Sequence, residues 1–196
     1  MSPRREHGGC WRTIGAGWGV GLLALWLAVA PAAVAAEAVE PSQEALLKVA
    51  LIYNFSQFIE WPANAFSAPS APLSICVMGI DPFGKSLAAL TKRSSNGRPI
   101  AIAYPQTLAE ARLCQILYVD GAQRTALGRD LGNALGAAPV LTISSSDASE
   151  AGIAIRFVHY AGKIRWTMNL DATRRARLKV SAKLIEIAVE VLGESK

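Results

Sequence analysis

The sequence predicts an α/β fold: a single-domain, three-layer sandwich in which flanking helices cover a largely parallel β-sheet. Between residues 73 and 146, short apolar segments alternate with segments that have helical spacing. This alternation is typical of parallel sheets that carry helices on both faces. Two further strand patterns lie on either side of Ala161 and Gly162, and a two-residue connection with Gly in second place predicts a hairpin. We therefore expect the sheet to include a C-terminal antiparallel hairpin.

The N-terminal segment has the three parts of an export signal. Its first residues are positively charged through Arg4, Arg5 and Arg12. An apolar block follows over residues 20–30, and small residues then stand at the spacing that a signal peptidase recognises, with cleavage after Ala35 or Ala36. The block is shorter than the ~20 apolar residues of a membrane span. We expect residues 1–36 to be a signal peptide and 37–196 to be the mature domain, with an uncleaved N-terminal anchor as the alternative.

The charge of the mature chain is mild. Residues 37–196 contain 17 Lys and Arg and 14 Asp and Glu, which leaves a net charge of +3. Proteins that bind nucleic acid usually concentrate much more positive charge, so we expect no nucleic-acid partner. His159 is the one histidine in this part, and a single histidine without a Cys/His cluster predicts no metal site.

The first helix is expected to start just after Pro41. Ser42 has the side chain of an N-cap, and Glu44 suits the positive N-terminal end of a helix. Pro62 disfavours helical geometry at the residue before it, so the helix should end near Glu60. Its apolar stripe, which we expect to face the core, consists of Leu47, Leu51, Phe55 and Phe58.

Four strands and three helices are expected in the central part of the chain. The strands cover residues 73–79, 96–105 (with a turn at its start), 115–121 and 138–146. The intervening helices cover residues 81–90, 107–114 and 122–136. The first strand is almost wholly apolar, as in a strand buried on both faces. Asp81 is expected to cap the first of these helices, with Pro82 at its first position.

The C-terminal part is expected to form the hairpin and one last helix. The hairpin strands cover residues 153–160 and 163–170. In the second strand, Ile164, Trp166, Met168 and Leu170 share one face, and Lys163, Arg165, Thr167 and Asn169 share the other. From Asp171 a helical region should run toward Leu192. Its apolar stripe would consist of Leu184, Ile187, Ala188 and Val191.

No arrangement for catalysis is visible in the sequence. Ser144 and Ser145 follow the fourth strand, at the edge where α/β sheets bind ligands, which makes them candidate contacts for a small ligand. No G-x-S-x-G segment surrounds them, and a polar loop is the simpler interpretation. We therefore expect no enzyme activity and no cofactor. Cys76 and Cys114 are the only cysteines after the signal segment; in an exported protein they indicate a disulfide, with two separately buried thiols as the alternative.

Five segments occur in a recognisable order along the chain. They are "KVALIYNFSQFIEWP", "LSICVMGIDPFG", "LCQILYV", "APVLTISSS" and "KIRWTMNLDATRRARLKVSAKLIEIA". With these segments, and over about residues 45–189, the chain resembles the YfiR family of periplasmic proteins. The first and last segments are the most specific.

The resemblance implies a regulator and not an enzyme. The best-known members of the family lie in the periplasm and bind the periplasmic sensor domain of an inner-membrane diguanylate cyclase, which they repress, so that cyclic di-GMP and biofilm formation fall. Cys76 and Cys114 match a cysteine pair of the family, whereas a second pair found in some members is absent here. Members tend to have Gly before the residue equivalent to Leu178, and Arg177 stands there instead. The break at this point is then weaker, or Arg177 is held in strained geometry.

The expected function is therefore that of a periplasmic protein that binds and represses an inner-membrane diguanylate cyclase. Aromatic and arginine side chains are favoured as anchors of protein interfaces. The candidate partner-binding residues are Trp61, at the end of the first helix, Arg165, on the polar face of the last strand, and Arg175, in a basic segment. Core packing is the alternative role of Trp61, and in most proteins the basic segment would be a solvated helix face. A periplasmic small-ligand binding protein, using Ser144 and Ser145, is the alternative. A homodimer is left open.

Overall fold

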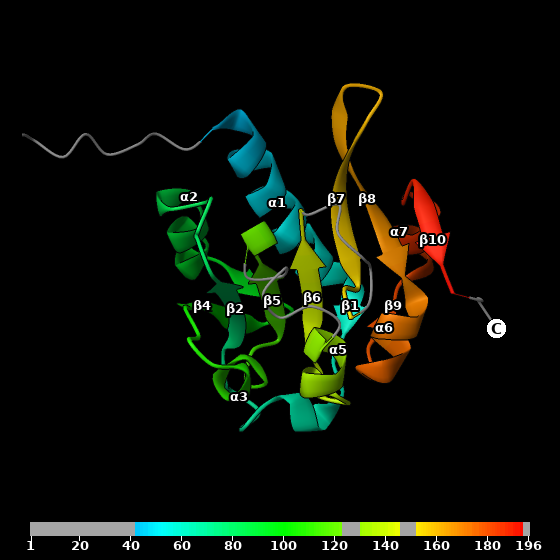
Figure 1. Ribbon diagram of the computed structural model, residues 1–196. Coiled ribbons are helices and arrows are strands. Elements are labelled where there is room, and N and C mark those ends of the chain that lie inside the picture. The colour runs from blue at the N-terminus through cyan, green and yellow to red at the C-terminus, as the bar shows by residue number, and fades with distance from the viewer. Residues whose placement is uncertain (1–41, 123–129, 146–151, 194–196) are drawn as a thin grey trace, which may run out of the picture. The chain divides into compact units, whose positions relative to one another are not determined.

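The structure is a computed structural model that describes residues 42–122, 130–145 and 152–193. Its helices are α1 (Gln43–Phe58), α2 (Lys85–Ala88), α3 (Leu108–Ala111), α5 (Asp130–Leu135), α6 (Leu170–Arg175) and α7 (Ala182–Glu186), with 3-10 turns η1 (Ala63–Ala65) and η2 (Ala89–Lys92). Its strands are β1 (Ile59–Glu60), β2 (Leu73–Met78), β3 (Ser94–Ser95), β4 (Arg98–Ala103), β5 (Ile116–Val119), β6 (Leu141–Ser144), β7 (Ile155–Tyr160), β8 (Lys163–Asn169), β9 (Lys179–Val180) and β10 (Glu190–Leu192). Within the described residues, eight strands form one sheet in the order β10-β8-β7-β6-β5-β2-β4-β3, and β1 pairs with β9 (Figure 1).

The sheet is largely parallel, as predicted. Strands β4, β2, β5, β6 and β7 run parallel to one another, whereas β3 is antiparallel to β4, and β7 and β8 form the antiparallel hairpin. Ala161 and Gly162 connect the hairpin strands with φ angles of 48° and 71°. Positive φ at both central residues is the conformation that matches the twist of a two-residue hairpin. The α/β class and the C-terminal hairpin are therefore confirmed.

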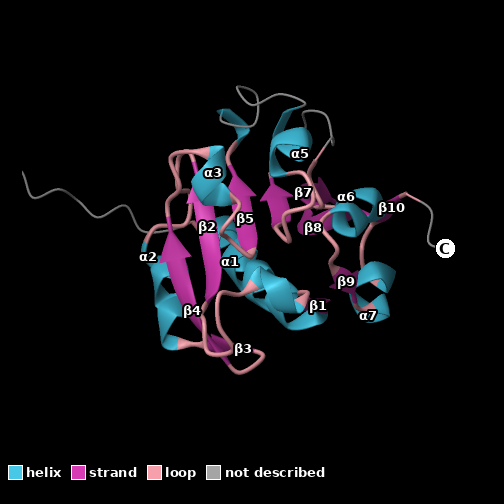
Figure 2. Cartoon of the chain, turned by 90° about the horizontal axis from the view of Figure 1, so that it is seen from below, coloured by secondary structure: helices cyan, strands magenta, loops and turns pink. Residues whose placement is uncertain are grey.

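Two apolar cores cover the two faces of the sheet and give the fold its three layers. Successive residues of a strand point to opposite faces. In β2, Ile75 and Val77 join a core with α1, whereas Cys76 and Met78 join a core with α3 and α5. Figure 2 shows α3 and α5 on one side of the strands and α1 on the other. Burial on both faces explains why the central strands are almost wholly apolar.

Helix α1 begins where the sequence predicts and ends two residues earlier. The Ser42 side chain accepts a hydrogen bond of 3.1 Å from the backbone N–H of Ala45, as an N-cap does. The helix ends at Phe58 because the next two residues turn extended and pair with β9, with Ile59 opposite Val180. The first helix is thus tied to the C-terminal part of the domain.

The buried face of α1 differs from the predicted stripe. The buried residues are Ala45, Val49, Ile52, Phe55 and Ser56. Leu47 is 44% exposed, and Leu51 and Phe58 are only partly buried. The helix carries apolar residues on nearly all sides, so spacing alone could not determine which side faces the sheet. Of the predicted stripe, only Phe55 lies fully in the core.

The central strands are confirmed, and the helices between them are shorter than predicted. Thr107 caps α3 by accepting a hydrogen bond of 3.2 Å from the N–H of Glu110. Asp81 caps a turn and not a helix: its Oδ1 accepts hydrogen bonds from the N–H groups of Phe83 and Gly84, at 2.7 and 3.2 Å, and α2 starts only at Lys85. Of the helix predicted over residues 122–136, α5 forms the last part, and residues 123–129 lie outside the described residues.

The C-terminal helix predicted from Asp171 to Leu192 is wrong. The segment contains four short elements instead, α6, β9, α7 and β10. The break comes at Arg177, whose φ of 56° is incompatible with a right-handed helix. Beyond α7 the chain becomes extended, and β10 pairs in parallel with β8, with Val191 opposite Met168. Arg177 therefore occupies the strained conformation that the resemblance had left as one of two possibilities.

The predicted signal peptide, residues 1–36, and its cleavage site lie outside the described residues. Among the residues that the structure does describe, no helix combines the length and the apolar character that a membrane crossing requires.

Candidate partner-binding surface

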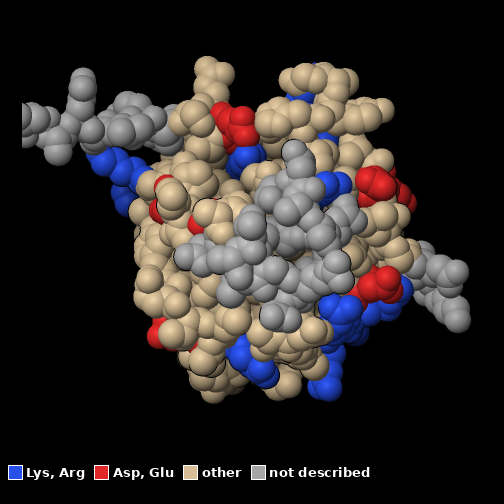
Figure 3. Space-filling view, viewed as in Figure 1, with Lys and Arg blue, Asp and Glu red and all other residues tan. Residues whose placement is uncertain are grey.

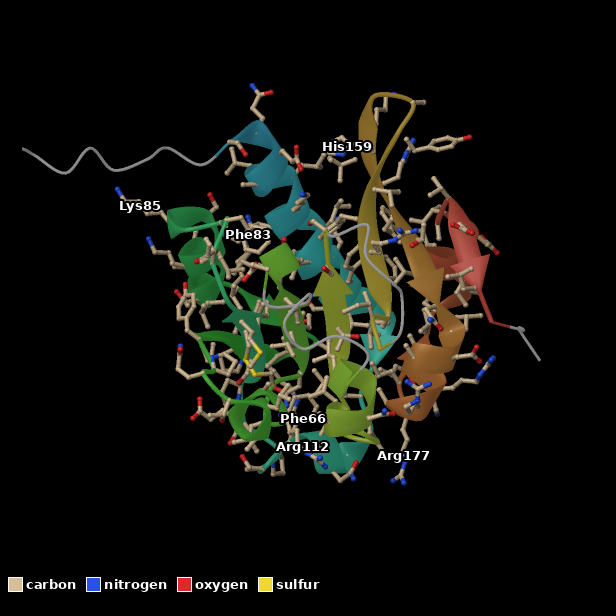
Figure 4. All side chains as sticks on the ribbon, in the orientation of Figure 1. Phe66, Phe83, Lys85, Arg112, His159 and Arg177 are labelled. Carbon is tan, nitrogen blue, oxygen red and sulfur yellow. A yellow bond between two sulfur atoms is a disulfide. The ribbon has the colours of Figure 1, made fainter. Side chains whose placement is uncertain are left out.

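The tip of the β7–β8 hairpin and the N-terminal turn of α1 enclose a cleft of about 490 Å³, which we call the hairpin cleft. Helix α1 contributes Gln43, Glu44 and Leu47, and the hairpin contributes His159, Gly162, Lys163, Ile164 and Arg165. In Figure 4, His159 projects from the hairpin toward the N-terminal end of α1. His159, Lys163 and Arg165 thus line the same cleft as the exposed apolar residue Leu47. This mixture suits the recognition of an acidic and partly apolar group.

One carboxylate lines the hairpin cleft, and it is already paired. Glu44 Oε1 lies 2.6 Å from Lys48 Nζ, and Glu44 Oε2 lies 3.4 Å from His159 Nε2. The hydrogen bond from Lys48, and to a smaller extent the charge of His159, lower the pKa of the Glu44 carboxyl below its ordinary value. Lys163 and Arg165 form no ion pair with any residue in the described ranges. The cleft therefore presents positive charge to a partner.

Arg165 lies where the strand alternation predicts. It is exposed, while its neighbour Trp166 is buried against Phe55, with ring centroids 5.2 Å apart. The polar face of β8 is not solvated along its whole length, however, because Thr167 is only 5% exposed. Only the half of this face near the hairpin tip is therefore exposed and accessible to a partner.

Trp61 is held in place by the domain itself. Its indole N–H donates a hydrogen bond of 3.2 Å to the backbone carbonyl of Gln115, and the ring packs against the larger core. It lines a second cleft of about 510 Å³ that also contains Phe66 and Arg98. The guanidinium of Arg98 lies 3.7 Å from the centroid of the Phe66 ring, a close cation–π contact. Trp61 is therefore a partly buried wall of this cleft and not a free surface anchor.

Arg175 lies in a third place. It is exposed in the last turn of α6 and lines a recess of about 20 Å³ beside Gly132 and Gly152. Figure 3 shows Lys and Arg side chains gathered at one corner, over α6 and the turn after it. The exposed members of this group are Arg174, Arg175, Arg177 and Lys179, and Arg174 forms an ion pair with Asp171. Trp61, Arg165 and Arg175 thus line three different recesses, and the structure does not bring them into one.

The two candidate ligand-binding serines are turned inward. Ser144 is fully buried in β6. Ser145 Oγ accepts a hydrogen bond of 3.1 Å from the Tyr118 hydroxyl, whose pKa is raised chiefly by burial. The Tyr118 ring in turn packs edge-on against Phe83, with centroids 4.7 Å apart. Both serines lie at the carboxyl end of β6, and their contact with a small ligand stays a prediction.

The carboxyl ends of β2 and β5, where the strand order reverses direction, hold two carboxylates. Asp120 Oδ2 accepts a hydrogen bond of 2.7 Å from the N–H of Ile80. Asp81 Oδ2 accepts one of 3.0 Å from the Tyr104 hydroxyl, and burial together with this contact raises the pKa of Tyr104. Such switch points are common ligand sites in α/β sheets. Among the described residues, however, no group of three or more His, Cys, Asp and Glu side chains gathers as metal ligands would.

Cys76 and Cys114 form a disulfide, with their Cα atoms 6.1 Å apart. Cys76 belongs to β2, and Cys114 lies just before β5, the parallel neighbour of β2. Both are buried in the core that contains α3 and α5. The alternative of two separate thiols is therefore wrong, and the bond links β2 to the segment that enters β5.

The exposed apolar residues on the outer side of α1 were not predicted. Leu46 is 50% and Leu47 is 44% exposed, and Ala50 is exposed as well. A signal was present, because two adjacent leucines in a helix point about 100° apart and cannot both be central to one buried stripe. Their exposure marks an apolar surface next to the hairpin cleft.

These features define a class of protein: a small α/β sandwich with a disulfide, whose recesses are open clefts. The model of a family described as YfiR/HmsC-like matches residues 45–189, and the chain belongs to this family. No curated protein matches the chain. Membership indicates a regulatory protein of cyclic di-GMP signalling, in a family that is periplasmic in general and acts with diguanylate cyclases.

Proposed function

We propose that this protein is a periplasmic repressor that binds the periplasmic sensor domain of an inner-membrane diguanylate cyclase and thereby lowers cyclic di-GMP and biofilm formation. The family match over residues 45–189 carries this proposal. The hairpin cleft supports it, because exposed cationic residues and one exposed apolar residue, Leu47, line it, which is the chemistry of an interface anchor. Export with removal of residues 1–36 belongs to the same proposal.

Repression requires only that the protein binds one state of the cyclase better than another. If the sensor domain exchanges between an inhibited and an active arrangement, preferential binding to the first shifts the population toward it. Arg165 and Lys163 would contribute chiefly to the rate of association and to specificity through their charge. Trp61, which is held by Gln115, would shape the second cleft, at the other end of α1.

A small-ligand binding role is the second candidate, and the hairpin cleft favours it. Its volume of about 490 Å³ is within the range of ligand sites, roughly 300–1,000 Å³. Lys163, Arg165 and the apolar Leu47 would select an anionic ligand with an apolar body. Such a ligand would compete with the cyclase for the same side chains. It would then regulate the repressor, so one protein could have both roles.

The test of the proposed function is the cellular level of cyclic di-GMP. We expect deletion of the gene to raise it, and the wild-type gene to restore it. Arg165→Glu should fail to restore it while melting at the wild-type temperature, because a charge reversal on an exposed strand position leaves the fold intact. Arg112→Glu is the matched control: Arg112 is also exposed and lies at the opposite end of the domain from His159 (Figure 4).

Two outcomes separate the parts of the proposal. An unchanged cyclic di-GMP level after deletion, under several growth conditions, would contradict the repressor function. A folded Arg165→Glu protein that represses as well as the wild type would leave the function standing and show that Arg165 is not part of the interface.

Export is tested separately by the intact mass of the protein in a periplasmic extract. We expect a chain that begins near Glu37. A mass that includes residues 1–30 would contradict cleavage.

A further inference from the structure

Helix α1 has an apolar outer side that nothing in the described residues covers. Leu46 and Leu47 are 50% and 44% exposed, and Ala50 is exposed between them and the exposed Asn54. The outward side of a surface helix is normally polar, since only the inward side is removed from water. We call Leu46, Leu47 and Ala50 the α1 outer face. Its composition indicates a surface that is buried in a complex.

A groove runs along one side of this face. It has a volume of about 410 Å³ and separates α1 from α2 and η2. Helix α1 lines it with Leu46, Ala50 and Tyr53, and the opposite wall presents Ser86, Ala89 and Arg93. Both sets follow the three- and four-residue steps of a helical ridge. The central side chains are small, which lets the backbone of another helix approach closely.

Cationic residues line both recesses that border the α1 outer face. On one flank, the guanidinium of Arg93 lies 5.3 Å from the centroid of the Tyr53 ring. On the other flank, Lys163 and Arg165 line the hairpin cleft together with Leu47. The one carboxylate that lines either recess among the described residues is Glu44, which is paired with Lys48 and His159. The surface is therefore an apolar strip between two cationic edges.

We propose that the α1 outer face, with its two cationic flanks, is the docking site for an amphipathic helix that has an apolar stripe bordered by acidic residues. Resting on the proposed function, the inference assigns this helix to the periplasmic sensor domain of the regulated cyclase. An apolar helix face seated in a groove between helices is a recurrent mode of recognition. Acidic residues on both borders would meet Arg93 on one side and Lys163 and Arg165 on the other.

The charges argue against a second copy of this chain as the occupant. In a two-fold interface the same patch meets itself, so the cationic flanks of one copy would face those of the other. Like charges placed together oppose such pairing, while an acidic partner gains from the same arrangement. The distribution of charge therefore favours an acidic partner over a second copy of this chain, and it favours binding along the α1 outer face.

The first experiment is photocrosslinking in living cells. A benzophenone amino acid replaces Leu46 in one strain and, as control, Leu113 in another; Leu113 is 76% exposed and lies next to Arg112, at the other end of the domain. We expect an adduct at position 46 whose cross-linked peptide, identified by mass spectrometry, comes from a helix with acidic residues on both sides of an apolar stripe. An adduct between two copies of this protein, a peptide without acidic residues, or no adduct at position 46 in repressed cells would overturn the inference.

The second experiment uses a matched pair of substitutions. Ala50→Glu places a negative charge in the middle of the α1 outer face, and Ala109→Glu makes the same change at an exposed position of α3, on the other face of the sheet. We expect Ala50→Glu to weaken binding to the cyclase sensor domain at least about tenfold and Ala109→Glu to leave it unchanged. Melting temperatures of both variants show whether the fold is intact.

The outcomes distinguish this inference from the function on which it rests. If gene deletion raises cyclic di-GMP and a folded Ala50→Glu protein restores it as well as Ala109→Glu does, the docking site is wrong and the repressor function stands. If deletion has no effect, the repressor function is wrong. Loss of repression by Ala50→Glu alone, at an unchanged melting temperature, supports both.

Discussion

Helix α1 covers one face of the sheet with 16 continuous residues, whereas α3 and α5, with four and six residues, lie on the opposite face. Ile52 and Phe55 of α1 are at most 1% exposed, and the Phe55 ring stacks on Phe157 with centroids 5.9 Å apart. Among the residues that the structure describes, the core of the α3–α5 layer contains no aromatic residue, but it contains the disulfide of Cys76 and Cys114. One layer is thus stabilised by apolar burial and the other in part by a covalent bond.

This difference indicates which layer can present an apolar surface to a partner. A long helix with apolar residues on nearly all sides packs one side against the core and leaves apolar side chains exposed on the other. The opposite layer contains the disulfide of Cys76 and Cys114, and its exposed leucine, Leu113, lies in the turn after α3 and not on a helix. We therefore propose that the partner-facing surface belongs to the α1 layer, and we expect the stability of the opposite layer to depend on redox conditions.

The largest expected effect concerns the α1 core. Phe55→Ala should lower the free energy of unfolding by about 3–5 kcal/mol, because it leaves a cavity among Phe157, Trp166 and the sheet. Phe58→Ala, at a partly buried position of the same helix, is the control and should cost less. Chemical denaturation measures both. Equal losses for the two variants would show that burial does not distinguish the sides of α1.

Breaking the disulfide should have the next largest effect. Replacing Cys114 by Ser should cost about 2–4 kcal/mol, since the bond closes a loop with a sequence separation of 38 residues. Reduction of the wild type should produce a similar loss, whereas the Cys114→Ser protein should not respond to reductant. A reduced wild type that melts at the same temperature as the oxidised protein would contradict the role given to the bond.

A smaller change of opposite sign is expected in the C-terminal segment. Arg177→Gly should raise the free energy of unfolding by up to about 1 kcal/mol, because Gly adopts the φ of 56° without the strain of a side chain. Asn96, with a φ of 49°, offers the comparison, since Asn tolerates this region better than Arg and Asn96→Gly should gain less. A destabilised Arg177→Gly protein would mean that the Arg177 side chain makes contacts worth more than the strain.

The smallest effect expected is the pH dependence of the contacts that Glu44 makes with Lys48 of α1 and His159 of the hairpin. The pKa of Glu44 is lowered, first by Lys48, so the stability it contributes is present above the ordinary value of 4.5 and is lost as the pH falls through the lower, folded-state pKa. The carboxylate is 42% exposed, so solvent screening should keep the contribution below about 1 kcal/mol. Unfolding of wild type and Glu44→Gln between pH 7 and 3 measures it. The two curves should converge as the pH falls; a constant separation would contradict the assignment.

Local patterns predicted much of the fold, and tertiary context decided the rest. The Ser42 cap, the central strands and the turn at Ala161 and Gly162 follow from residue types that favour one backbone conformation. The exposed side of α1 could not be predicted, because apolar residues surround the helix. Only the position of the sheet and of α2 determines which side is buried. The C-terminal segment has helical spacing, yet β8 offers an open edge to which β10 adds.

The candidate site was predictable to a smaller extent. The position of Arg165 could be predicted from strand alternation, which places it on the face of β8 that does not carry the buried Trp166. The pairing of the hairpin tip with Glu44 could not be predicted, because those residues are more than one hundred positions apart in the chain. The same holds for Trp61, whose hydrogen bond to Gln115 depends on how β5 enters the sheet.

The central claim is that this domain inhibits a diguanylate cyclase through the α1 side of the sandwich. The most direct test adds the purified mature domain, residues 37–196, to the detergent-solubilised full-length cyclase and measures the rate of cyclic di-GMP synthesis. The account predicts that the wild-type domain lowers this rate in a saturable way, that Arg165→Glu and Ala50→Glu do so only at much higher concentration, and that Ala109→Glu acts like the wild type. A rate that stays unchanged at saturating wild-type domain would contradict the claim.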